Sequence, residues 1–311
     1  MNTITTTVTV MGATGHTGSK VARRLLKSGT RVRALGRSES RLAALQDAGA
    51  EVRAGDVADA GFLSEAFRGA DAVYTLLATD RHASDYAVRQ AREGEAIASA
   101  IRESGVPLVV ALSSLGANLP DAPGVIAGLR AQEERLRCIS GLNLLLLRPA
   151  SFFENFFDAL DVVRQMGVLA DSVAPDIAMP MVAADDIAAV AAKALMERDW
   201  SGIAVQELLG PRDLSHVEVA RILGERIGQP DLPCVQLADA EMANALVGAG
   251  LSPSFADLYV EMTRAFNASS VHPLDGRNNR NSTTTTFEDF VGELAGAYAA
   301  LLSCHKFVKA N

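Results

Sequence analysis

A glycine-rich segment near the N-terminus constrains this chain more than any other feature. The stretch VTVMGATGHTGSKVARRLL, Val8 to Leu26, places Gly12, Gly15 and Gly18 between a β-branched apolar run and a run with helical periodicity. A turn leading directly from a strand into a helix can hold a phosphate, because the first N–H groups and the positive end of the helix dipole face the ligand. The segment therefore predicts an α/β fold with a dinucleotide at this turn.

Each glycine has a physical role in this interpretation. Gly12 would take the unusual φ of the tight turn, Gly15 would let the backbone approach a pyrophosphate, and Gly18 would let the helix pack closely. The spacing is GxxGxxG rather than GxGxxG, so a plain strand-to-helix turn is the alternative. Further donors to the cofactor are expected from Thr14, His16 and Thr17.

The first half of the chain alternates strand-like and helix-like segments. Strands are expected at Val8–Met11, Thr30–Leu35, Glu51–Ala54, Ala72–Leu77, Pro107–Leu112 and Leu142–Leu147. Helices are expected at Thr17–Ser28, Arg41–Ala48, Gly61–Phe67, Ser84–Ser104 and Val125–Ile139. This rhythm predicts an α/β fold with a doubly wound parallel sheet of the Rossmann type, with ligands at the carboxyl ends of its strands.

In the second half of the chain the regular alternation of strand-like and helix-like segments ends. A helix is expected over Phe152–Val163, a strand over Asp176–Val182 and a helix over Asp186–Met196, before a mostly helical remainder. Capping boxes at Ser215 with Glu218, and at Thr285 with Glu288, would open two of the later helices. We expect a cofactor-binding domain over 1–153, with 176–205 packing onto it, and a smaller, mostly helical substrate lobe over 206–302.

The residue after the second strand indicates which dinucleotide is bound. NAD sites usually place an acidic residue there for the ribose 2′-OH, whereas this chain has Arg37 in RVRALGRSESR. The planar guanidinium matches a 2′-phosphate, so the segment predicts NADP(H). Solvated surface charges at Arg37 and Arg41 are the alternative.

Two further strand ends supply expected cofactor contacts. After the third strand, Asp56 would accept from the adenine amino group while Val57 packs on the ring, and a turn or helix-opening aspartate is the alternative. Leu77 and Ala78, at the end of the fourth strand, are also expected to line the cofactor.

Composition excludes several classes of protein. The net charge of −8 argues against a nucleic-acid surface. The cysteines Cys138, Cys234 and Cys304 have no metal-ligand spacing, and we expect no metal and a reduced, cytoplasmic chain. The start MNTITTT lacks the features of a secretion signal, and GLNLLLLRPA is too short to span a bilayer, so no membrane association is expected.

Taken with these motifs, the chain resembles the NmrA-like branch of the atypical short-chain dehydrogenases/reductases. The resemblance rests on GATGHTG, the Arg37 position, GDVAD and above all LLLLRPASFFENF (Leu144–Phe157), and it extends from about Val8 to Val291. DDIAAVAAKAL (Asp185–Leu195) and ELLGPRDLSHVEVARILGERIG (Glu207–Gly228) are similar to later family segments. The resemblance implies that the nicotinamide side is lined by Pro149, Ala150, Ser151, Phe152 and Asn155.

The wider superfamily uses a serine and Tyr-x-x-x-Lys to deliver a proton to a carbonyl, and this chain departs from that pattern. Ser113 and Ser114 occupy the serine region, while the tyrosine and lysine places fall near Ile126 and Arg130. Isoleucine transfers no proton, and an arginine could hold the nicotinamide ribose without acting as a base. The catalytic candidates are therefore limited to Ser114 and Arg130.

Several functions remain open at this point. The favoured one is an NADPH-dependent oxidoreductase that transfers hydride to a small conjugated acceptor such as a quinone, because a delocalised product anion needs no strong proton donor. Phe152, Phe153 and Asn155 would contact that acceptor, although the phenylalanines of this run also have the spacing of a helix core. The alternative is a non-catalytic NADP(H) sensor that acts through a protein partner. A nucleotide-sugar epimerase would need NAD and the missing tyrosine, and a homodimer is left open in every case.

Overall fold

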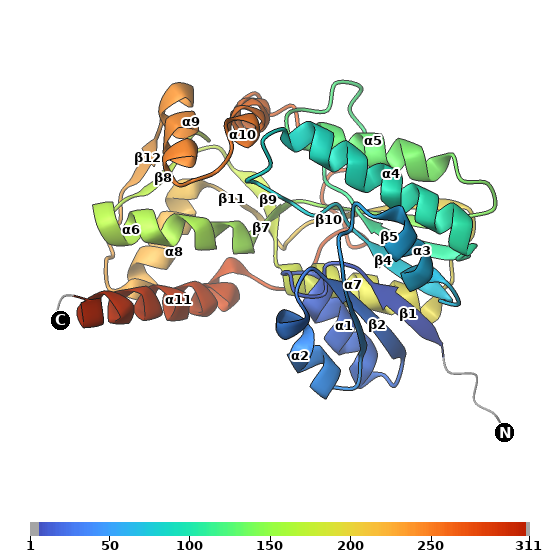
Figure 1. Cartoon of the computed structure of the whole chain (residues 1–311). Coiled ribbons are helices and arrows are strands. Elements are labelled where there is room, and N and C mark those ends of the chain that lie inside the picture. Colours follow the sequence, from blue (N-terminus) through green and yellow to red (C-terminus); the bar gives the residue numbers. More distant parts are fainter. Residues whose placement is uncertain (1–5, 309–311) are drawn as a thin grey trace. The chain divides into compact units, whose positions relative to one another are not determined.

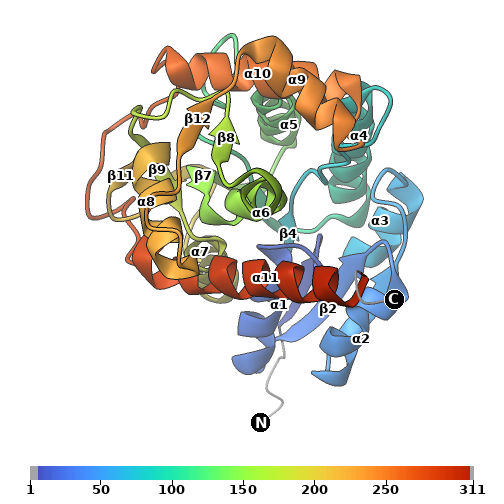
Figure 2. The same ribbon diagram turned by 90° about the vertical axis from the view of Figure 1, so that its left-hand side faces the viewer.

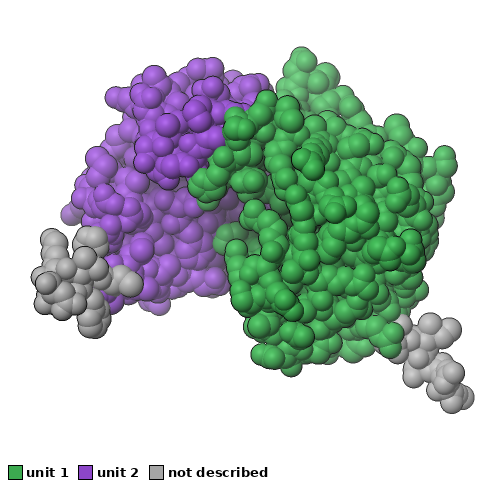
Figure 3. All heavy atoms as spheres, viewed as in Figure 1, with its two compact units in different colours: residues 1–149, 184–207 green, residues 150–183, 208–311 purple. Residues whose placement is uncertain are grey.

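The computed structural model describes residues 6–308, with side chains for 6–303, so the Cys304 side chain lies outside what is described. Figure 3 shows its two compact units, unit 1 (Met1–Pro149 and Ala184–Glu207) and unit 2 (Ala150–Ala183 and Leu208–Asn311). This division differs from the expected one. Residues 150–153 and 176–183 belong to unit 2, because the short strands there pair within that unit.

Unit 1 is built on a seven-stranded sheet with the order β10-β6-β5-β4-β1-β2-β3. Its strands are β1 (Thr7–Val10), β2 (Arg31–Gly36), β3 (Glu51–Ala54), β4 (Ala72–Thr75), β5 (Leu108–Leu112), β6 (Asn143–Pro149) and β10 (Ile203–Leu208). The strands β1 to β6 pair in parallel. Since β1 has β2 on one side and β4 on the other, the strand order reverses at β1, which is where ligands bind in doubly wound sheets.

Helices cover both faces of this sheet, as Figure 1 shows. They are α1 (Gly18–Lys27), α2 (Glu39–Asp47), α3 (Ala60–Phe67), α4 (Tyr86–Ser104), α5 (Ile126–Arg137) and α7 (Ala184–Glu197). The amphipathic pattern fixes their inward faces, for Val21, Ala22 and Leu25 of α1 are all buried. Local signals set their ends, since Asp85 caps α4 by accepting from the N–H of Val88, and Gly105 ends it in the left-handed conformation.

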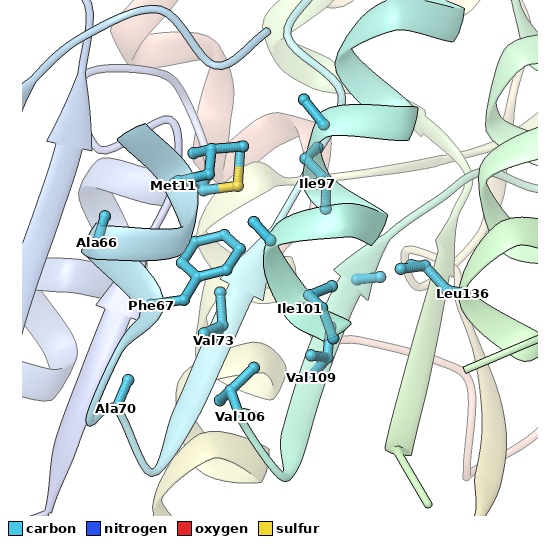
Figure 4. Packing of buried hydrophobic residues seen from close by; sticks show 14 of the residues in the cluster. Met11, Ala66, Phe67, Ala70, Val73, Ile97, Ile101, Val106, Val109 and Leu136 are labelled. Carbon is cyan, nitrogen blue, oxygen red and sulfur yellow. The ribbon is translucent and has the colours of Figure 1, made fainter. Parts of the chain in front are cut away.

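A hydrophobic core fills the space between the sheet and the α3, α4 and α5 layer (Figure 4). Phe67 of α3, Ile97 and Ile101 of α4 and Val109 of β5 are 0–1% exposed within it. Met11, the residue before Gly12, is part of the same core. The glycine turn is therefore anchored to this core.

Unit 2 contains two small sheets and a set of helices. The sheets have the orders β11-β9-β7 and β12-β8, and the second sheet and the adjacent helices α9 and α10 can be followed in Figure 2. Their strands are β7 (Ser151–Phe152), β8 (Leu169–Asp171), β9 (Met179–Val182), β11 (Asp213–Leu214) and β12 (Cys234–Gln236). The helices are α6 (Leu160–Met166), α8 (His216–Ile227), α9 (Asp239–Gly248), α10 (Pro253–Asn267) and α11 (Phe287–Val308).

Two local expectations in unit 2 are corrected by the structure. The single helix expected over Phe152–Val163 is instead strand β7, a 3₁₀ helix over Phe153–Ala159 and α6, because Phe152 pairs with Val182 of β9. The capping box of Ser215 and Glu218 is confirmed. The second box lies one residue later than expected: Thr286 and Asp289 exchange the two hydrogen bonds, because α11 begins at Phe287.

Among the described helices, none is both long enough and apolar enough to cross a membrane.

Candidate dinucleotide site

The glycine turn after β1 has the backbone geometry that its sequence predicts. Gly12 has a φ of +61°, which favours glycine, and its carbonyl accepts from the N–H of Gly15 at 2.9 Å. A Cβ at Gly18 would overlap the carbonyl oxygen of Gly12, so the close contact between helix and turn requires a glycine there. At Gly15, which is exposed, a Cβ would meet only that oxygen, at 3.4 Å. Gly15 is thus the glycine whose open side faces solvent.

The polar residues of the turn do not all face the same way. Thr17 is 4% exposed, and its hydroxyl accepts a 3.0 Å hydrogen bond from the buried Tyr74 hydroxyl of β4. This side chain therefore ties the start of α1 to the sheet rather than facing solvent. His16 is exposed, and Thr14 is partly exposed beside Gly36 at the end of β2. The helix has no acidic residue in its first turn, so nothing there opposes an anion.

Arg37 follows the last residue of β2 directly and is exposed. Other arginines of this region have carboxylate partners: Arg33 and Arg53 both pair with Glu51. In the described part of the chain no ion pair engages Arg37. Its guanidinium is free to meet an anion at the end of β2.

Asp56 lies just beyond β3 and is already partly bonded. Its Oδ1 accepts from the backbone N–H of Ala58 at 3.0 Å and from Arg89 of α4 at 2.7 Å. The bond from Arg89 lowers the pKa of the Asp56 carboxyl, which burial alone would raise. Val57 faces the core and is 6% exposed, so little of its side chain is left to pack on an adenine ring.

The loop after β4 is held by a buried carboxylate. The backbone N–H of Ala78 donates to Glu93 of α4 at 3.0 Å, and Glu93 also accepts from Arg89 at 2.7 Å. Leu77 belongs to the core, whereas Ala78 is partly exposed. Arg89 and Glu93 therefore connect the loops after β3 and β4.

A second buried network joins the ends of β5 and β6. Glu133 of α5 accepts from Arg148 at 2.8 and 2.6 Å and from the Ser113 hydroxyl at 2.7 Å. Burial would raise the pKa of Glu133, but the hydrogen bonds from Arg148 and Ser113 and the positive charge of Arg148 outweigh it, so the pKa is lowered. Ser113 is committed to this structural role, while the next residue, Ser114, is partly exposed.

The superfamily's tyrosine and lysine positions are occupied by structural side chains. Ile126 is 2% exposed and lies at the start of α5. Arg130 donates to the carbonyl oxygen of Leu119 at 2.7 Å and pairs with Glu134 at 2.8 Å. Its guanidinium thus braces the loop after β5, and a contact with a nicotinamide ribose remains a prediction.

The segment after β6 divides between two environments. Pro149 ends β6, where its carbonyl accepts from the N–H of Leu115 at 3.0 Å. Ala150 is buried, whereas Phe152 is partly exposed and Asn155 is exposed. Phe153 is 1% exposed and packs against Phe287 and Phe290, with ring centroids 5.2 and 5.5 Å apart. The expected stacking of Phe153 on an acceptor is corrected, since other rings already surround it.

Five residues of these networks were not among the expected site residues: Tyr74, Arg89, Glu93, Glu133 and Arg148. In the sequence Tyr74 sits in a buried strand and is typical of core. Arg89 and Glu93 have the i,i+4 spacing of an ordinary surface pair on a helix. The signal that could have found them is the sheet topology, which brings the amino-terminal half of α4 beside two strand ends.

Comparison with known proteins identifies the family. A family model described as NAD(P)H-binding matches residues 12–198. A (4-alkanoyl-5-oxo-2,5-dihydrofuran-3-yl)methyl phosphate reductase of Streptomyces griseus is 32% identical over 162 residues, covering 52% of this chain and 54% of that protein. An NAD(P)H azoreductase of Xenophilus azovorans is 28% identical over 162 residues, covering 51% and 53%. The match spans about half the length of each relative.

Solved structures match over nearly the whole chain. An NADPH-dependent quinone oxidoreductase of Escherichia coli, complexed with NADPH, has a TM-score of 0.73 at 24% identity and covers 92% of this chain and 99% of its own. The triphenylmethane reductase of a Citrobacter species has a TM-score of 0.76 at 21% identity and covers 93% and 99%. At these identities the likeness shows the fold alone. The chain belongs to the NAD(P)H-binding family.

Proposed function

We propose that the chain is an NADPH-dependent reductase that transfers hydride to a small conjugated acceptor. The observation that carries this proposal is Arg37 at the end of β2, which is exposed and has no ion-pair partner among the described residues, where an NAD site would have an acidic residue. The Arg37 fork suits a 2′-phosphate, and the positive amino-terminal end of the α1 dipole suits a pyrophosphate. The open side of Gly15 leaves room for that pyrophosphate to approach the backbone.

Bound NADPH would supply the hydride, and the chain's own groups would bind and orient. The glycine turn and Arg37 would hold the phosphates, and Asp56 would accept from the adenine amino group. Toward the nicotinamide, the ends of β5 and β6 offer Ser114 and Pro149, in a backbone fixed by the buried Glu133–Arg148 pair. Orientation of the two reactants then accounts for most of the rate acceleration.

The choice of acceptor class follows from which proton donors are missing. Ile126 is buried at the tyrosine position, and Arg130 is always charged, so neither can protonate an alkoxide. Hydride addition to a neutral conjugated acceptor gives a delocalised anion that water can protonate, and addition to a cationic dye gives a neutral product that needs no proton. The relatives fit this class, because their names describe reductases of a furanone, azo compounds, quinones and a triphenylmethane dye.

The test is to follow oxidation of NADPH by the purified chain with a panel of quinones, azo dyes, triphenylmethane dyes and unsaturated lactones. The proposal expects acceptor-dependent loss of NADPH, with turnover for at least one class. Tight NADPH binding without turnover across the panel would reject the reductase and favour a sensor that acts through a partner protein. Absence of NADPH binding by folded protein would reject both.

A further inference from the structure

We infer that Arg89 and Glu93 of α4 are positioning residues that orient Asp56 toward the adenine of the cofactor. The inference rests on the proposed function, because it assigns these residues a task in the same site. Both lie in unit 1 on successive turns of α4. The Arg89 side chain bonds to Asp56 in the loop after β3, and the Glu93 side chain bonds to the Ala78 N–H in the loop after β4.

Glu93 is the fixed point of this arrangement. Its side chain is 0% exposed, and its two oxygens have different partners: Oε2 accepts from the Ala78 N–H at 3.0 Å and Oε1 from Arg89 Nε at 2.7 Å. Burial raises the pKa of this carboxyl, and the adjacent guanidinium opposes that effect. A buried carboxylate is retained at low cost only when its oxygens are bonded, as they are here.

Arg89 carries this order outward to Asp56. With Nε on Glu93, its Nη2 donates to Asp56 Oδ1 at 2.7 Å, so the planar fork spans two carboxylates. The Asp56 side chain is 50% exposed and the Arg89 side chain 22%. Arg89 thus links the half-exposed Asp56 carboxylate to the buried Glu93 carboxylate, whose two oxygens are both hydrogen-bonded.

The two oxygens of Asp56 are not equivalent as a result. Oδ1 is occupied by the Ala58 N–H and by Arg89, whereas among the described residues Oδ2 has only a 3.4 Å contact with Nη1 of Arg89. Oδ2 is therefore the oxygen left with capacity for a donor from the ligand. An adenine presents such a donor in its 6-amino group, and hypoxanthine presents a carbonyl acceptor at the same place.

This chemistry gives a direct test with two ligands. Nicotinamide hypoxanthine dinucleotide phosphate, reduced form, differs from NADPH in this base alone: a carbonyl acceptor replaces the 6-amino donor, and N1 changes from an acceptor to a donor. The wild-type chain is expected to bind NADPH about 10-fold more tightly than this analogue, the effect of one charge-assisted hydrogen bond. Asp56→Ala is expected to bring the ratio of the two dissociation constants close to one.

The decisive variants are in α4. Arg89→Met combined with Glu93→Gln leaves no buried carboxylate without a partner, so the double variant avoids the main cause of misfolding. We expect it to bring the ratio to within about 2-fold of one, with weaker NADPH binding and unchanged preference for NADPH over NADH. Arg89→Lys cannot span both carboxylates, so its ratio of dissociation constants is expected to lie between those of the wild-type chain and the double variant. Arg102→Met, in the same helix and paired with Glu95, is the matched control and should keep the wild-type ratio.

Each remaining outcome has a definite meaning. A wild-type ratio in the double variant, with near-ultraviolet circular dichroism unchanged, would show that Arg89 and Glu93 only fasten α4 to the loops, and would overturn the inference. A ratio near one in the wild-type chain would also overturn it while leaving the proposed function intact. Absence of NADPH binding by the wild-type chain would overturn the proposed function and this inference with it.

Discussion

At the scale of single residues, the site depends on which groups face solvent and which face the core. Gly15 and Arg37 present an open backbone and a free charge, whereas Thr17, Val57 and Phe153 have their side chains inside. Sequence motifs predicted that the turn would carry phosphate contacts but not these orientations. Direction is set by packing partners such as Tyr74, which a single sequence does not reveal.

Two glycines of the turn, Gly15 and Gly18, are predicted to differ in their effects on cofactor binding and on stability. Gly15→Val should leave the free energy of unfolding within about 1 kcal/mol of wild type, because a side chain at Gly15 would point into open space. The same side chain should abolish NADPH binding, because it would occupy the space where the pyrophosphate approaches the backbone. Gly18→Ala should lower stability by about 1–3 kcal/mol, because its Cβ overlaps the Gly12 carbonyl. Urea unfolding and NADPH titration of both variants measure this. Unimpaired binding by Gly15→Val would show that the turn carries no phosphate.

At the scale of helices and strands, periodicity and apolar runs located nearly every element of unit 1 to within about two residues. Its helices have one apolar face, and its central strands are apolar runs buried on both faces. The elements of unit 2 were harder to locate because polar contacts between distant segments decide them. Along α10, Tyr259, Thr263 and Asn267 recur every fourth residue. They bond to the last residue of β8, Asp171, and to Ser172 after it. Such a stripe is indistinguishable in sequence from a solvated helix face.

The Glu133 network links α5 to β5 and β6 and should make unit 1 sensitive to acid. Because the folded pKa of Glu133 is lowered, its contribution is present above its ordinary value of 4.5 and is lost as pH falls below it. Glu133→Gln should cost about 3–5 kcal/mol at neutral pH and show a shallower loss of stability in acid. The neighbour Glu134, exposed and paired with Arg130, is the control, and Glu134→Gln should cost no more than about 1 kcal/mol. Equal losses in the two variants at neutral pH would contradict this role.

The cap of α11 tests the corrected start of that helix. Thr286 accepts from the Asp289 N–H at 3.1 Å, so Thr286→Ala should lower the free energy of unfolding by about 1 kcal/mol. Thr284→Ala, at an exposed loop position, should have little effect. Thermal unfolding of the two variants compares them directly, and a larger loss at Thr284 would place the cap elsewhere.

At the scale of the whole molecule, two units have separate cores and the chain crosses between them more than once. The sequence predicted that the alternation of strands and helices ends near residue 150 and that 176–205 packs onto the first domain. In the structure Ala184–Glu207, which contains α7, belongs to unit 1. The sequence did not predict that β9 stays with unit 2, because the partners β7 and β11 are only two residues long. Strands of that length carry no periodic signal.

Unit 2 should respond to mild acid through His216. This residue is 6% exposed, its Nδ1 has no hydrogen-bond partner among the described residues, and burial lowers its pKa despite the opposing charge of Asp171. The unfolded chain then binds a proton that the folded chain does not, so stability should fall as pH drops below about 6.5, by up to about 1.4 kcal/mol per pH unit. His216→Leu should reduce that slope in urea unfolding between pH 7.5 and 5.5. An unchanged slope would exclude His216 as its source.

We propose that the end of β2 binds the 2′-phosphate of NADPH. The ratio of the NADH dissociation constant to the NADPH dissociation constant measures this preference. We predict that the wild-type chain prefers NADPH by about 100-fold and that Arg37→Ala lowers this preference to less than about 10-fold, the loss of a bidentate charged contact. NADH binding should barely change in the variant, because NADH lacks the phosphate that Arg37 would contact. Equal weakening of both cofactors by Arg37→Ala, or a wild-type preference for NADH, would contradict the account.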